Sequence, residues 1–416
     1  MSATKRALIA AIPPSHGGVT AMLGVTAQAL RSLGIEPTFA WYEPWSMTPE
    51  LSVPFWRLGR SSVSSVRREV LGDPEEHQAE RASRGYAIGA YLPELEFTHY
   101  RATRPWRDLI ACHELHLVVS GTAMAGRAFM ETGTPFLAWL ASDWYGDRKD
   151  RVRTFPAIRR VLDVVVVQPR ARSLERRILR TGRVLALSRA TQNKLIRIVG
   201  TGVEINVLSF PVDTELFRPD ASARVPGRIG FVGRFDDPRK NLALFLRALA
   251  EARRSPETGG APLTAVVLGA SPDDRHREIV RSLDLGHVVR FLGRLSRREF
   301  AQELRTVEVL AVTSHQEGLH IGALEAMASG VPVVSTRCGG PEEYVQEEVT
   351  GLIGSFAPES IAGCLLRLRG DSRLRDEMGR NARKLVEDRY SPSGSFELLR
   401  EEIRRFPYGR KAECVV

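Results

Sequence analysis

The amino-acid sequence predicts an α/β protein with two doubly wound parallel sheets that face each other across a cleft. In the second half of the chain, short runs rich in Val, Ile and Leu alternate with segments of helical periodicity. The first half shows the same alternation more loosely, and proline and glycine gather between Pro211 and Gly227. Strand, helix and strand at this spacing are typical of βαβ units. We therefore expect one domain in residues 1–215 and another in residues 216–390.

The first domain is expected to open with a strand, Ala7–Ile12, followed by a helix, Val19–Leu33. Later apolar runs are expected to be further strands of its sheet: Leu115–Val119, Phe136–Leu140, Val164–Val167 and Val184–Leu187. Each run is short and apolar, as strands that are buried on both faces are. They predict a parallel sheet for this half as well.

The second domain alternates more cleanly. Its predicted strands are Ile229–Val232, Ala265–Leu268, Val288–Leu292, Val307–Val312 and Val333–Ser335. Its predicted helices are Leu242–Arg253, Arg275–Leu283, Arg297–Thr306 and Ala323–Ser329. Ligands bind at the carboxyl ends of the strands in such sheets. Residues that directly follow strands should therefore line one side of the cleft: Gly233, Gly269, Gly293 and Ser314.

Composition excludes several classes of protein. The 416 residues are 43% hydrophobic and 26% charged, which is ordinary for a globular protein of two domains. No apolar run approaches the length of a membrane span, and the stretch Ala7–Ile12 is too short for a signal peptide. The four cysteines show no CxxC spacing and are expected to be free thiols. These features favour a cytoplasmic protein.

The net charge of +10 is unevenly distributed. Twelve basic residues and three acidic ones lie between Arg148 and Arg183, so this stretch alone carries +9. An anionic membrane surface, an acidic acceptor and a merely solvated face remain open interpretations. Nucleic acid is not expected as a partner, because no nucleic-acid-binding module accompanies the charge.

Two glutamates stand eight positions apart in a loop and the helix that follows it. Glu317 lies in a glycine-containing loop, and Glu325 lies just inside a short helix that stops at Gly330. The N-terminus of a helix presents backbone N–H groups that suit a phosphate. Two nearby carboxylates could take the hydroxyls of a sugar or a ribose. The pattern therefore points to a phosphate-linked sugar as the ligand.

Two cations follow the first strand of the second domain. Arg234 and Lys240 flank an Asp-Pro turn that can direct both side chains toward the strand end. A sugar nucleotide leaves a diphosphate whose growing negative charge needs a metal or fixed cations. The chain contains no Asp-x-Asp motif, and Asp236-Asp237 and Asp273-Asp274 are expected to be turn or capping residues. Arg234 and Lys240 are therefore the expected cations, with no metal and no separate cofactor.

The second half resembles the retaining glycosyltransferases of family 4, which have the two-Rossmann-domain GT-B architecture. The resemblance rests on Gly233-Arg234…Lys240-Asn241, on Ser314…Glu317-Gly318…Glu325-Ala-Met-Ala-Ser-Gly330-Val-Pro332 and on Gly339-Gly340-Pro-Glu-Glu343. It covers roughly residues 184–390. It implies transfer of a hexose from a nucleotide-diphosphate sugar, such as a UDP-sugar or GDP-mannose, without metal and with retention. It also implies that a C-terminal helix, residues 391–408, packs back on the first domain.

The resemblance assigns roles in the donor site. Glu317 would face the donor sugar, Glu325 would take the ribose hydroxyls, and Arg234 with Lys240 would hold the diphosphate. The loop residues expected to contact the donor with them are Gly318, Leu319, His320 and Ile321. The chain departs from the family here, because members commonly have Gly-x-Pro where this chain has His320-Ile-Gly322. His320 either forms a hydrogen bond with a sugar hydroxyl, or narrows the sugar pocket, or is a tolerated loop variant.

The first domain departs further from the family. Gly17 and Gly18 resemble the family's glycine loop, which lets backbone approach the nucleotide or the acceptor. The family's first-domain histidine is missing, and Ala141-Ser142-Asp143 stand in its place. Asp143 is a candidate for a substrate-contacting, catalytic role. The tryptophan-rich segment from Trp41 to Thr103 is the expected region for acceptor specificity.

The sequence thus favours a retaining hexosyltransferase with a hydroxyl acceptor, expected to be a lipid-linked or cell-envelope glycan. That acceptor would explain the basic stretch if the protein docks peripherally on anionic lipid. A non-catalytic nucleotide-sugar-binding or scaffold protein of the same fold is the alternative, supported by the missing histidine. A sugar-nucleotide epimerase is a third option, which would form no acceptor product.

Overall fold

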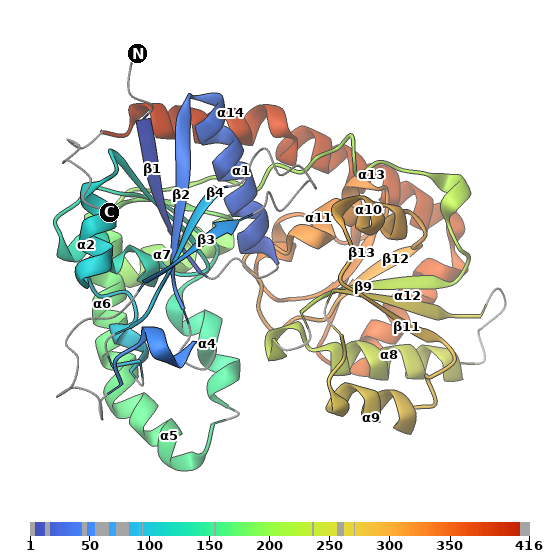
Figure 1. The fold of residues 1–416 in the computed structure, drawn as a ribbon. Helices are drawn as coiled ribbons and strands as arrows, with labels where there is room; N and C mark the ends of the chain where they lie inside the picture. Colours follow the sequence, from blue (N-terminus) through green and yellow to red (C-terminus); the bar gives the residue numbers. More distant parts are fainter. Residues whose placement is uncertain are drawn as a thin grey trace. The chain divides into compact units, whose positions relative to one another are not determined.

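The structure, a computed structural model, divides the chain into two compact units: residues 1–209 with 396–416 (unit 1), and residues 210–395 (unit 2) (Figure 1). The expected domain boundary after residue 215 lies a few residues beyond this division. Residues described are 5–12, 17–43, 48–54, 66–71, 83–90, 92–93, 95–153, 155–234, 237–255, 262–269 and 271–407, with backbone alone at 49, 66–71 and 151.

Unit 1 contains an eight-stranded sheet in the order β3-β4-β2-β1-β5-β6-β7-β8. The described pairings are parallel except for β3 with β4, which is antiparallel. The strands are β1 (Lys5–Ala11), β2 (Ile35–Tyr42), β3 (Val66–Leu71), β4 (Ser83–Ile88), β5 (Leu115–Ser120), β6 (Leu137–Leu140), β7 (Arg183–Ala186) and β8 (Ile205–Val207). The predicted parallel sheet is confirmed, with an antiparallel edge strand that was not predicted.

The helices of unit 1 connect these strands. They are α1 (Gly18–Ser32), α2 (Arg104–Ala111), α3 (Arg127–Glu131), α4 (Trp144–Val152), α5 (Ala157–Leu162), α6 (Gln168–Thr181), α7 (Arg189–Val199) and α14 (Pro392–Arg405), with short helical turns η1 (Pro49–Leu51), η4 (Glu96–Thr98) and η5 (Ala123–Gly126). Arg183 and Glu402 form a 2.7 Å ion pair that joins α14 to β7. The expected C-terminal helix is therefore held against the sheet of unit 1.

The predicted strand Val164–Val167 is wrong. These residues belong to a π-helical turn, η6 (Asp163–Val167), which continues α5 directly into α6. Asp163 is buried and bonds the guanidinium of Arg148, whereas Val164 and Val165 are 58% and 66% exposed. The run of valines favours a strand by intrinsic preference, but a buried ion pair and the flanking helices hold it in helical conformation.

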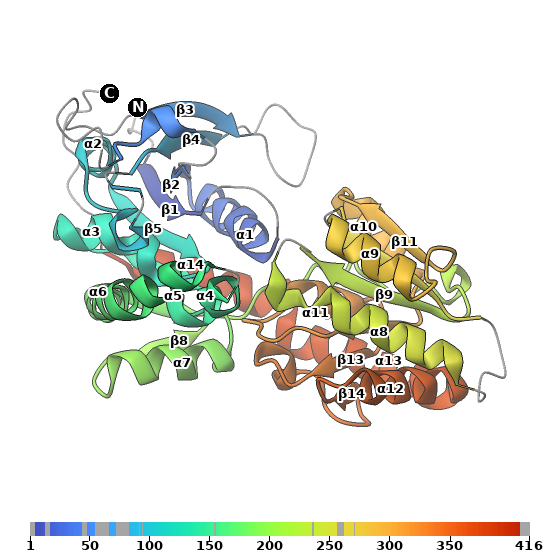
Figure 2. The same ribbon diagram turned by 90° about the horizontal axis from the view of Figure 1, so that it is seen from below.

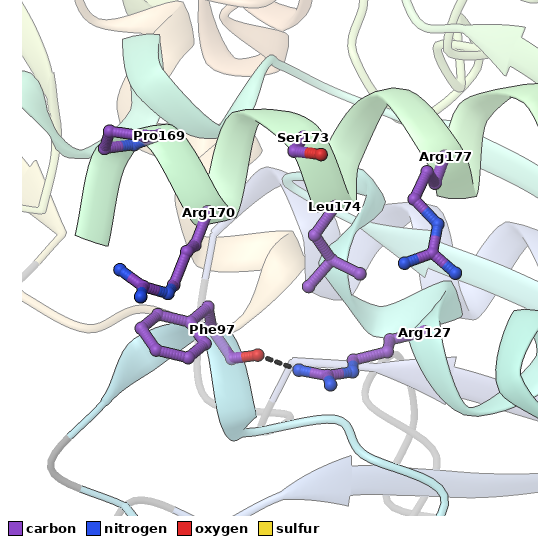
Figure 3. A pocket seen from close by; sticks show the side chains of 7 residues that line it. All are labelled: Phe97, Arg127, Pro169, Arg170, Ser173, Leu174 and Arg177. Carbon is purple, nitrogen blue, oxygen red and sulfur yellow. Dashed lines mark hydrogen bonds between the residues drawn. The ribbon is translucent and has the colours of Figure 1, made fainter. Parts of the chain in front are cut away.

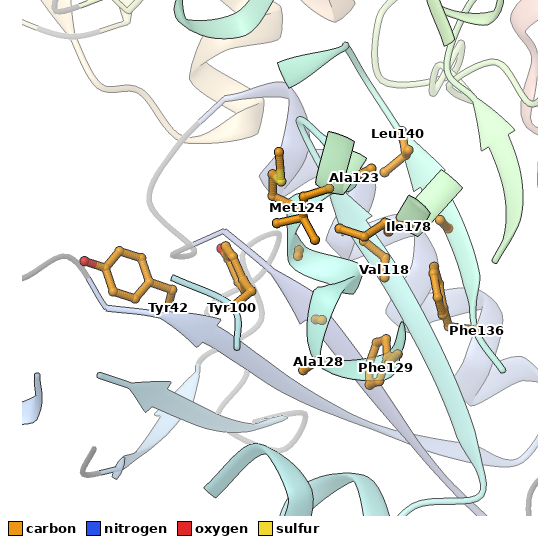
Figure 4. Packing of buried hydrophobic residues seen from close by; sticks show 14 of the residues in the cluster. Tyr42, Tyr100, Val118, Ala123, Met124, Ala128, Phe129, Phe136, Leu140 and Ile178 are labelled. Carbon is orange, nitrogen blue, oxygen red and sulfur yellow. The ribbon is translucent and has the colours of Figure 1, made fainter. Parts of the chain in front are cut away.

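The core of unit 1 lies on both sides of β1 and β5. Residues Ala7–Ala10 are fully buried, as expected for a strand in the middle of a covered parallel sheet. Phe129 and Phe136 pack with their ring centroids 5.7 Å apart, next to Val118 and Ile178 in the same cluster (Figure 4). Unit 1 therefore has a hydrophobic core of its own.

Unit 2 contains a six-stranded, all-parallel sheet in the order β11-β10-β9-β12-β13-β14. The strands are β9 (Arg228–Gly233), β10 (Thr264–Gly269), β11 (Val289–Gly293), β12 (Val309–Val312), β13 (Val333–Thr336) and β14 (Gly351–Gly354). The helices are α8 (Leu242–Arg254), α9 (Asp274–Ser282), α10 (Arg297–Arg305), α11 (Ile321–Ala328), α12 (Pro358–Gly370) and α13 (Ser372–Tyr390), with turns η7 (Ala221–Ala223), η8 (Pro238–Lys240) and η9 (Gly340–Glu343) (Figure 2). The predicted alternation is confirmed, and β14 is an additional strand.

In each sheet the strand that comes first in the chain lies inside the sheet, with later strands on both sides of it. In unit 2, β9 lies between β10 and β12, and in unit 1, β1 lies between β2 and β5. The connections on either side of such a strand run to opposite faces of the sheet, which leaves a crevice at the carboxyl ends of the two central strands. In unit 2 this rule places the expected ligand site at the carboxyl ends of β9 and β12.

The cysteines differ from expectation at one position. Cys338 and Cys364 are free thiols, whereas Cys112 is disulfide-bonded, so the expectation of free thiols is wrong for Cys112. Cys414 lies outside the described residues. No helix in the described part of the chain combines the length and the apolar character needed to span a bilayer.

Candidate functional site

The strand order of unit 2 brings two predicted loops together. The segment after β9 contains Arg234 and Lys240, and the segment after β12 contains Glu317. Their backbones are joined directly, because His315 N–H donates to the carbonyl of Arg239 at 2.7 Å. The structure therefore brings Lys240 and Glu317 together at the strand ends, inside a single unit.

Glu317 is the centre of this cluster. Its Oε1 accepts hydrogen bonds from Lys240 Nζ at 2.7 Å and from Ser314 Oγ at 2.5 Å. Glu317 is 9% exposed. Burial by itself would raise the pKa of Glu317, but the charge of Lys240 and the two hydrogen bonds bring this pKa below its usual value. The carboxylate is therefore ionised, fixed in position and partly neutralised by Lys240.

Two of the predicted donor-site glycines shape the end of β9. A Cβ at Gly233 would lie 3.2 Å from Cγ of Lys240, so glycine lets the lysine stem cross the strand end closely. Gly269 has φ of +130°, and a Cβ there would lie 2.1 Å from the Gly233 carbonyl oxygen. Gly233 therefore leaves room for Lys240, and Gly269 lets the ends of β9 and β10 approach closely. Gly293 ends the edge strand β11, two strands away from β9, and its donor contact stays a prediction.

The loop that carries Glu317 is hydrogen-bonded to residues 338–344, which include the turn η9. Glu317 N–H donates to the Cys338 carbonyl at 2.7 Å, and Gly340 N–H donates to the Glu317 carbonyl at 3.1 Å. The Tyr344 hydroxyl donates to the carbonyl of Leu319 at 2.7 Å. Leu319 is itself buried. These bonds hold the backbone from Glu317 to Leu319 in place.

Gly340 leaves no room for a side chain in this clamp. A Cβ at Gly340 would lie 2.3 Å from the Gly318 carbonyl oxygen. We expect Gly340→Ala to lower the free energy of unfolding by about 1–3 kcal/mol, because the backbone must shift. The matched control is Gly363→Ala in the middle of α12, where nothing lies within 4 Å and alanine should stabilise the helix. Urea unfolding of both variants with the same sign would contradict this account.

His320 occupies a left-handed backbone position at the start of α11. Its φ is +62°, and its ring Nδ1 accepts a hydrogen bond from Ala323 N–H at 3.1 Å. Burial, followed by the charge of Lys240, lowers the pKa of His320 to about 4, while Glu317 acts in the opposite direction. The ring is thus neutral near pH 7 with its hydrogen on Nε2, a tautomer assigned from this bond. His320 caps the helix, and its contact with a donor stays a prediction.

The lowered pKa of His320 makes stability depend on pH. The unfolded chain takes up a proton near pH 6.5 and the folded chain does so near pH 4, so stability falls as the pH falls through this window. The full effect is about 3 kcal/mol. We expect His320→Asn to flatten the dependence measured by urea unfolding, because Asn tolerates φ above zero and can cap Ala323.

The difference between wild type and His320→Asn is the relevant quantity in that experiment. Burial also lowers the pKa values of His99 and His116 in unit 1, and these contribute to the same window in both proteins. Glu317, whose pKa is lowered from that of a carboxylic acid, loses its contribution at lower pH. An unchanged slope between pH 4 and 6.5 in the variant would show that another group titrates.

Glu325 is paired with an arginine that the sequence did not reveal as part of the site. Arg297, in the first turn of α10, donates to Glu325 Oε1 at 2.9 Å. Glu325 is 4% exposed, and the guanidinium of Arg297 lies over the ring of Phe217 at 5.0 Å. Arg297 therefore orients the carboxylate. The only sequence signal was its place at a helix start after β11, which does not name Glu325 as a partner.

Arg234 and its neighbours form the outer edge of the cluster. Asp237 caps η8 and bonds Arg239 at 2.6 Å and, at 3.4 Å, Arg234. Burial alone would raise the pKa of Asp237, but its bonds with Arg239 lower it to about 2. The Arg234 side chain remains 40% exposed. Asp237 and, at the start of α9, Asp273 therefore have the expected capping role. Arg239 is a further basic residue that sequence reasoning did not single out.

The predicted residues of the first domain lie in unit 1. Gly17, with φ of +109°, is the N-cap of α1, and Gly18 is the first residue of that helix. Asp143 is buried, and its Oδ2 accepts from Gly146 N–H at 2.7 Å, so it caps α4. Its Oδ1 has no hydrogen-bond partner among the described residues, and Lys194 Nζ lies 4.0 Å away. Substrate contact by Gly17, Gly18 or Asp143 stays a prediction.

Of the three tryptophans in the segment proposed for acceptor recognition, only Trp41 is described, and it is buried. Trp41, Trp106, Trp139 and Trp144 are 6% exposed or less. The indole N–H groups of Trp41 and Trp139 bond Glu43 and the Leu208 carbonyl. The remaining two, Trp45 and Trp56, lie outside the described residues. Aromatic side chains that could contact an acceptor are therefore not found among the four described tryptophans.

The sequence of the chain is similar to a known family and to known proteins. Residues 226–371 match the family described as Glycosyl transferases group 1. A D-inositol 3-phosphate glycosyltransferase of Kineococcus radiotolerans is 32% identical over 258 residues, which are 56% of this chain and 59% of that protein. The chain therefore spans little more than half the length of this relative.

Two solved structures resemble the whole chain. A sucrose-phosphate synthase from Thermosynechococcus elongatus has a TM-score of 0.71 at 19% identity, covering 97% of this chain and 98% of that one. Anabaena Alr3699/HepE in complex with UDP-glucose has a TM-score of 0.69 at 15% identity, covering 96% and 99%. At these identities the likeness shows the fold, two Rossmann-like domains of the GT-B architecture.

Proposed function

Residues 226–371 form a domain of the glycosyl transferases group 1 family, and from this premise we propose that the protein is a retaining hexosyltransferase. Its donor is a nucleotide-diphosphate sugar, and its acceptor is a hydroxyl of a lipid-linked or cell-envelope glycan. The observation that carries the proposal is the fixed Lys240–Glu317 pair at the strand-order reversal of unit 2. Charges of both signs are held there 2.7 Å apart.

The diphosphate of the donor contacts the cations, and the hydroxyl groups of the donor contact the carboxylates. Lys240 has two further N–H donors besides the one on Glu317, and with Arg234 it provides cations for the diphosphate. Glu317 can accept hydrogen bonds from hydroxyls of the sugar, and Glu325 from hydroxyls of the ribose. Opposite charges at the two ends of the scissile bond therefore orient the donor before the reaction begins.

The chemical step needs no nucleophile from the protein. The bond between the anomeric carbon and the diphosphate oxygen breaks, and negative charge develops on that oxygen beside Lys240 and Arg234. The acceptor oxygen bonds the anomeric carbon on the same face, and its proton passes to the leaving phosphate oxygen. Glu317 is already ionised and hydrogen-bonded, so it supports positive charge developing on the sugar without moving a proton.

We propose that the fixed cations take the place of a metal. Transfer measured in excess EDTA should equal transfer with added Mg²⁺. A requirement for Mg²⁺ would contradict this part of the proposal.

The proposal is tested by binding and by product. Thermal shift with UDP-, GDP- and ADP-sugars should identify a donor, because a bound donor stabilises the folded chain by mass action. The matching donor and a lipid-linked acceptor should then give a product whose anomeric configuration is that of the donor. Binding without transfer would favour the non-catalytic scaffold, and a changed donor sugar without acceptor product would indicate an epimerase.

A further inference from the structure

One helical segment of unit 1 presents its apolar face to solvent. Helix α5 and the turn η6 expose Val164 by 58%, and Ile158, Val161, Leu162 and Val165 by 82%, 63%, 48% and 66%. The last four form a row. These residues are spaced i, i+3, i+4 and i+7, which places them along one side of a helix. We call these four residues the apolar stripe. Such a stripe normally faces the core, and no residue of α5 is buried.

The other side of this segment is anchored to unit 1. Asp163 is 2% exposed and bonds Arg148, which also bonds Glu96 at 2.7 Å. Val167 is buried in the core cluster of unit 1. The segment is therefore held by its inner face, and the apolar stripe is its outer face.

The charge around the stripe has one sign. Between residues 155 and 181 all seven arginines are exposed, Arg159 and Arg160 within α5 and five more in α6. The two acidic residues in this range, Asp163 and Glu175, are 2% and 1% exposed. The exposed side chains that carry charge on this segment are thus all cationic.

A pocket follows the stripe along α6. It has a volume of about 560 Å³ and lies between α6, η4 and α3. Arg170 and Arg177 point from α6 toward Phe97 and Arg127 on the opposite wall (Figure 3). Arg127 is balanced by Glu131 at 2.7 Å, while Arg170 lies over the ring of Phe97 at 5.9 Å. Guanidinium groups above an apolar floor suit an anionic head group.

We propose that the apolar stripe inserts into the interfacial region of an anionic lipid bilayer, with the surrounding arginines on the lipid phosphates. Aliphatic side chains flanked by arginines are the pattern of a helix that lies in a membrane interface. A second copy of this chain would bring two cationic surfaces together, so self-association is disfavoured. The proposal concerns unit 1 alone and is independent of the proposed transfer reaction.

Vesicle sedimentation of the full chain without donor or acceptor tests the proposal. Wild type should sediment with phosphatidylcholine vesicles that contain about 30% phosphatidylglycerol, and poorly with phosphatidylcholine alone. Ile158→Gln/Val161→Gln/Val165→Gln should weaken binding at least about tenfold. Arg159→Gln and Arg160→Gln should each weaken it about fivefold, since one cation contributes about 1 kcal/mol at such a surface.

Exposed apolar residues elsewhere provide the matched control. Leu398 and Val349 are 53% and 44% exposed, and Leu398→Gln/Val349→Gln should bind vesicles as wild type does. Thermal unfolding should be unchanged in all of these variants, because the replaced side chains face solvent. Equal sedimentation of the triple variant and wild type would overturn the proposal. A dimer in solution that the triple variant abolishes would overturn it as well.

Discussion

Lys240→Met is expected to lower kcat/KM for glycosyl transfer by about 10³-fold, as the loss of a fixed group that stabilises developing charge typically does. Lys240 Nζ lies 2.7 Å from Glu317, so it stands where the sugar and the diphosphate meet in the proposed complex. The methionine keeps the length and apolar character of the lysine stem that crosses Gly233. The measurement is steady-state transfer with the donor found by thermal shift.

The same substitution also acts on folding. It leaves Glu317 buried without its cation, which should cost about 3 kcal/mol in the free energy of unfolding and raise the pKa of Glu317. Lys240→Met/Glu317→Gln removes the isolated charge and should recover most of that stability. Transfer should remain lost in the double variant, which separates the chemical role of the pair from its structural role.

Lys384→Met is the matched control for Lys240→Met. Lys384 also forms an ion pair, with Asp388, but its side chain is 75% exposed. An exposed pair contributes little, so both stability and transfer should stay near wild type. If Lys240→Met retained more than about a tenth of wild-type kcat/KM, the assignment of Lys240 to the leaving group would be wrong.

Part of this arrangement could be predicted from the sequence, because alternating strand and helix segments indicate a parallel sheet. Apolar runs and helical segments alternate through unit 2, and in a parallel sheet the residues that follow the strands lie at one edge. Arg234, Lys240 and Glu317 were therefore predictable at the same edge. The buried Lys240–Glu317 pair was not, because it depends on β9 lying beside β12, and spacing along the chain does not give the strand order.

The sequence-based errors have a common physical cause. Val164–Val167 favours a strand by composition, yet the contact of Asp163 with Arg148 and the adjoining helices make it helical. Arg297 was assigned only to a helix start, although it orients Glu325. In both cases a long-range contact between charged groups decides the outcome, and local preference carries no information about it.

Glu325→Ala is expected to lower kcat/KM for a ribonucleotide donor by about 10²-fold, mainly through KM. A hydrogen bond from a hydroxyl to a carboxylate contributes about 1.5–3 kcal/mol, and the proposed complex places the ribose hydroxyls on Glu325. A donor with a 2′-deoxyribose lacks one of these hydroxyls. Wild type should therefore discriminate against the deoxy donor, and Glu325→Ala should use both donors with nearly equal efficiency.

The comparison of two donors separates a ribose contact from a folding defect, because a misfolded site would lose both equally without changing their ratio. Any loss of stability from removing the partner of Arg297 acts on both donors alike and leaves their ratio unchanged. Glu359→Ala, an exposed glutamate at the start of α12, is the control and should keep the wild-type ratio. If Glu325→Ala discriminated between the donors as strongly as wild type, Glu325 would serve only to hold Arg297, and the ribose would be bound elsewhere.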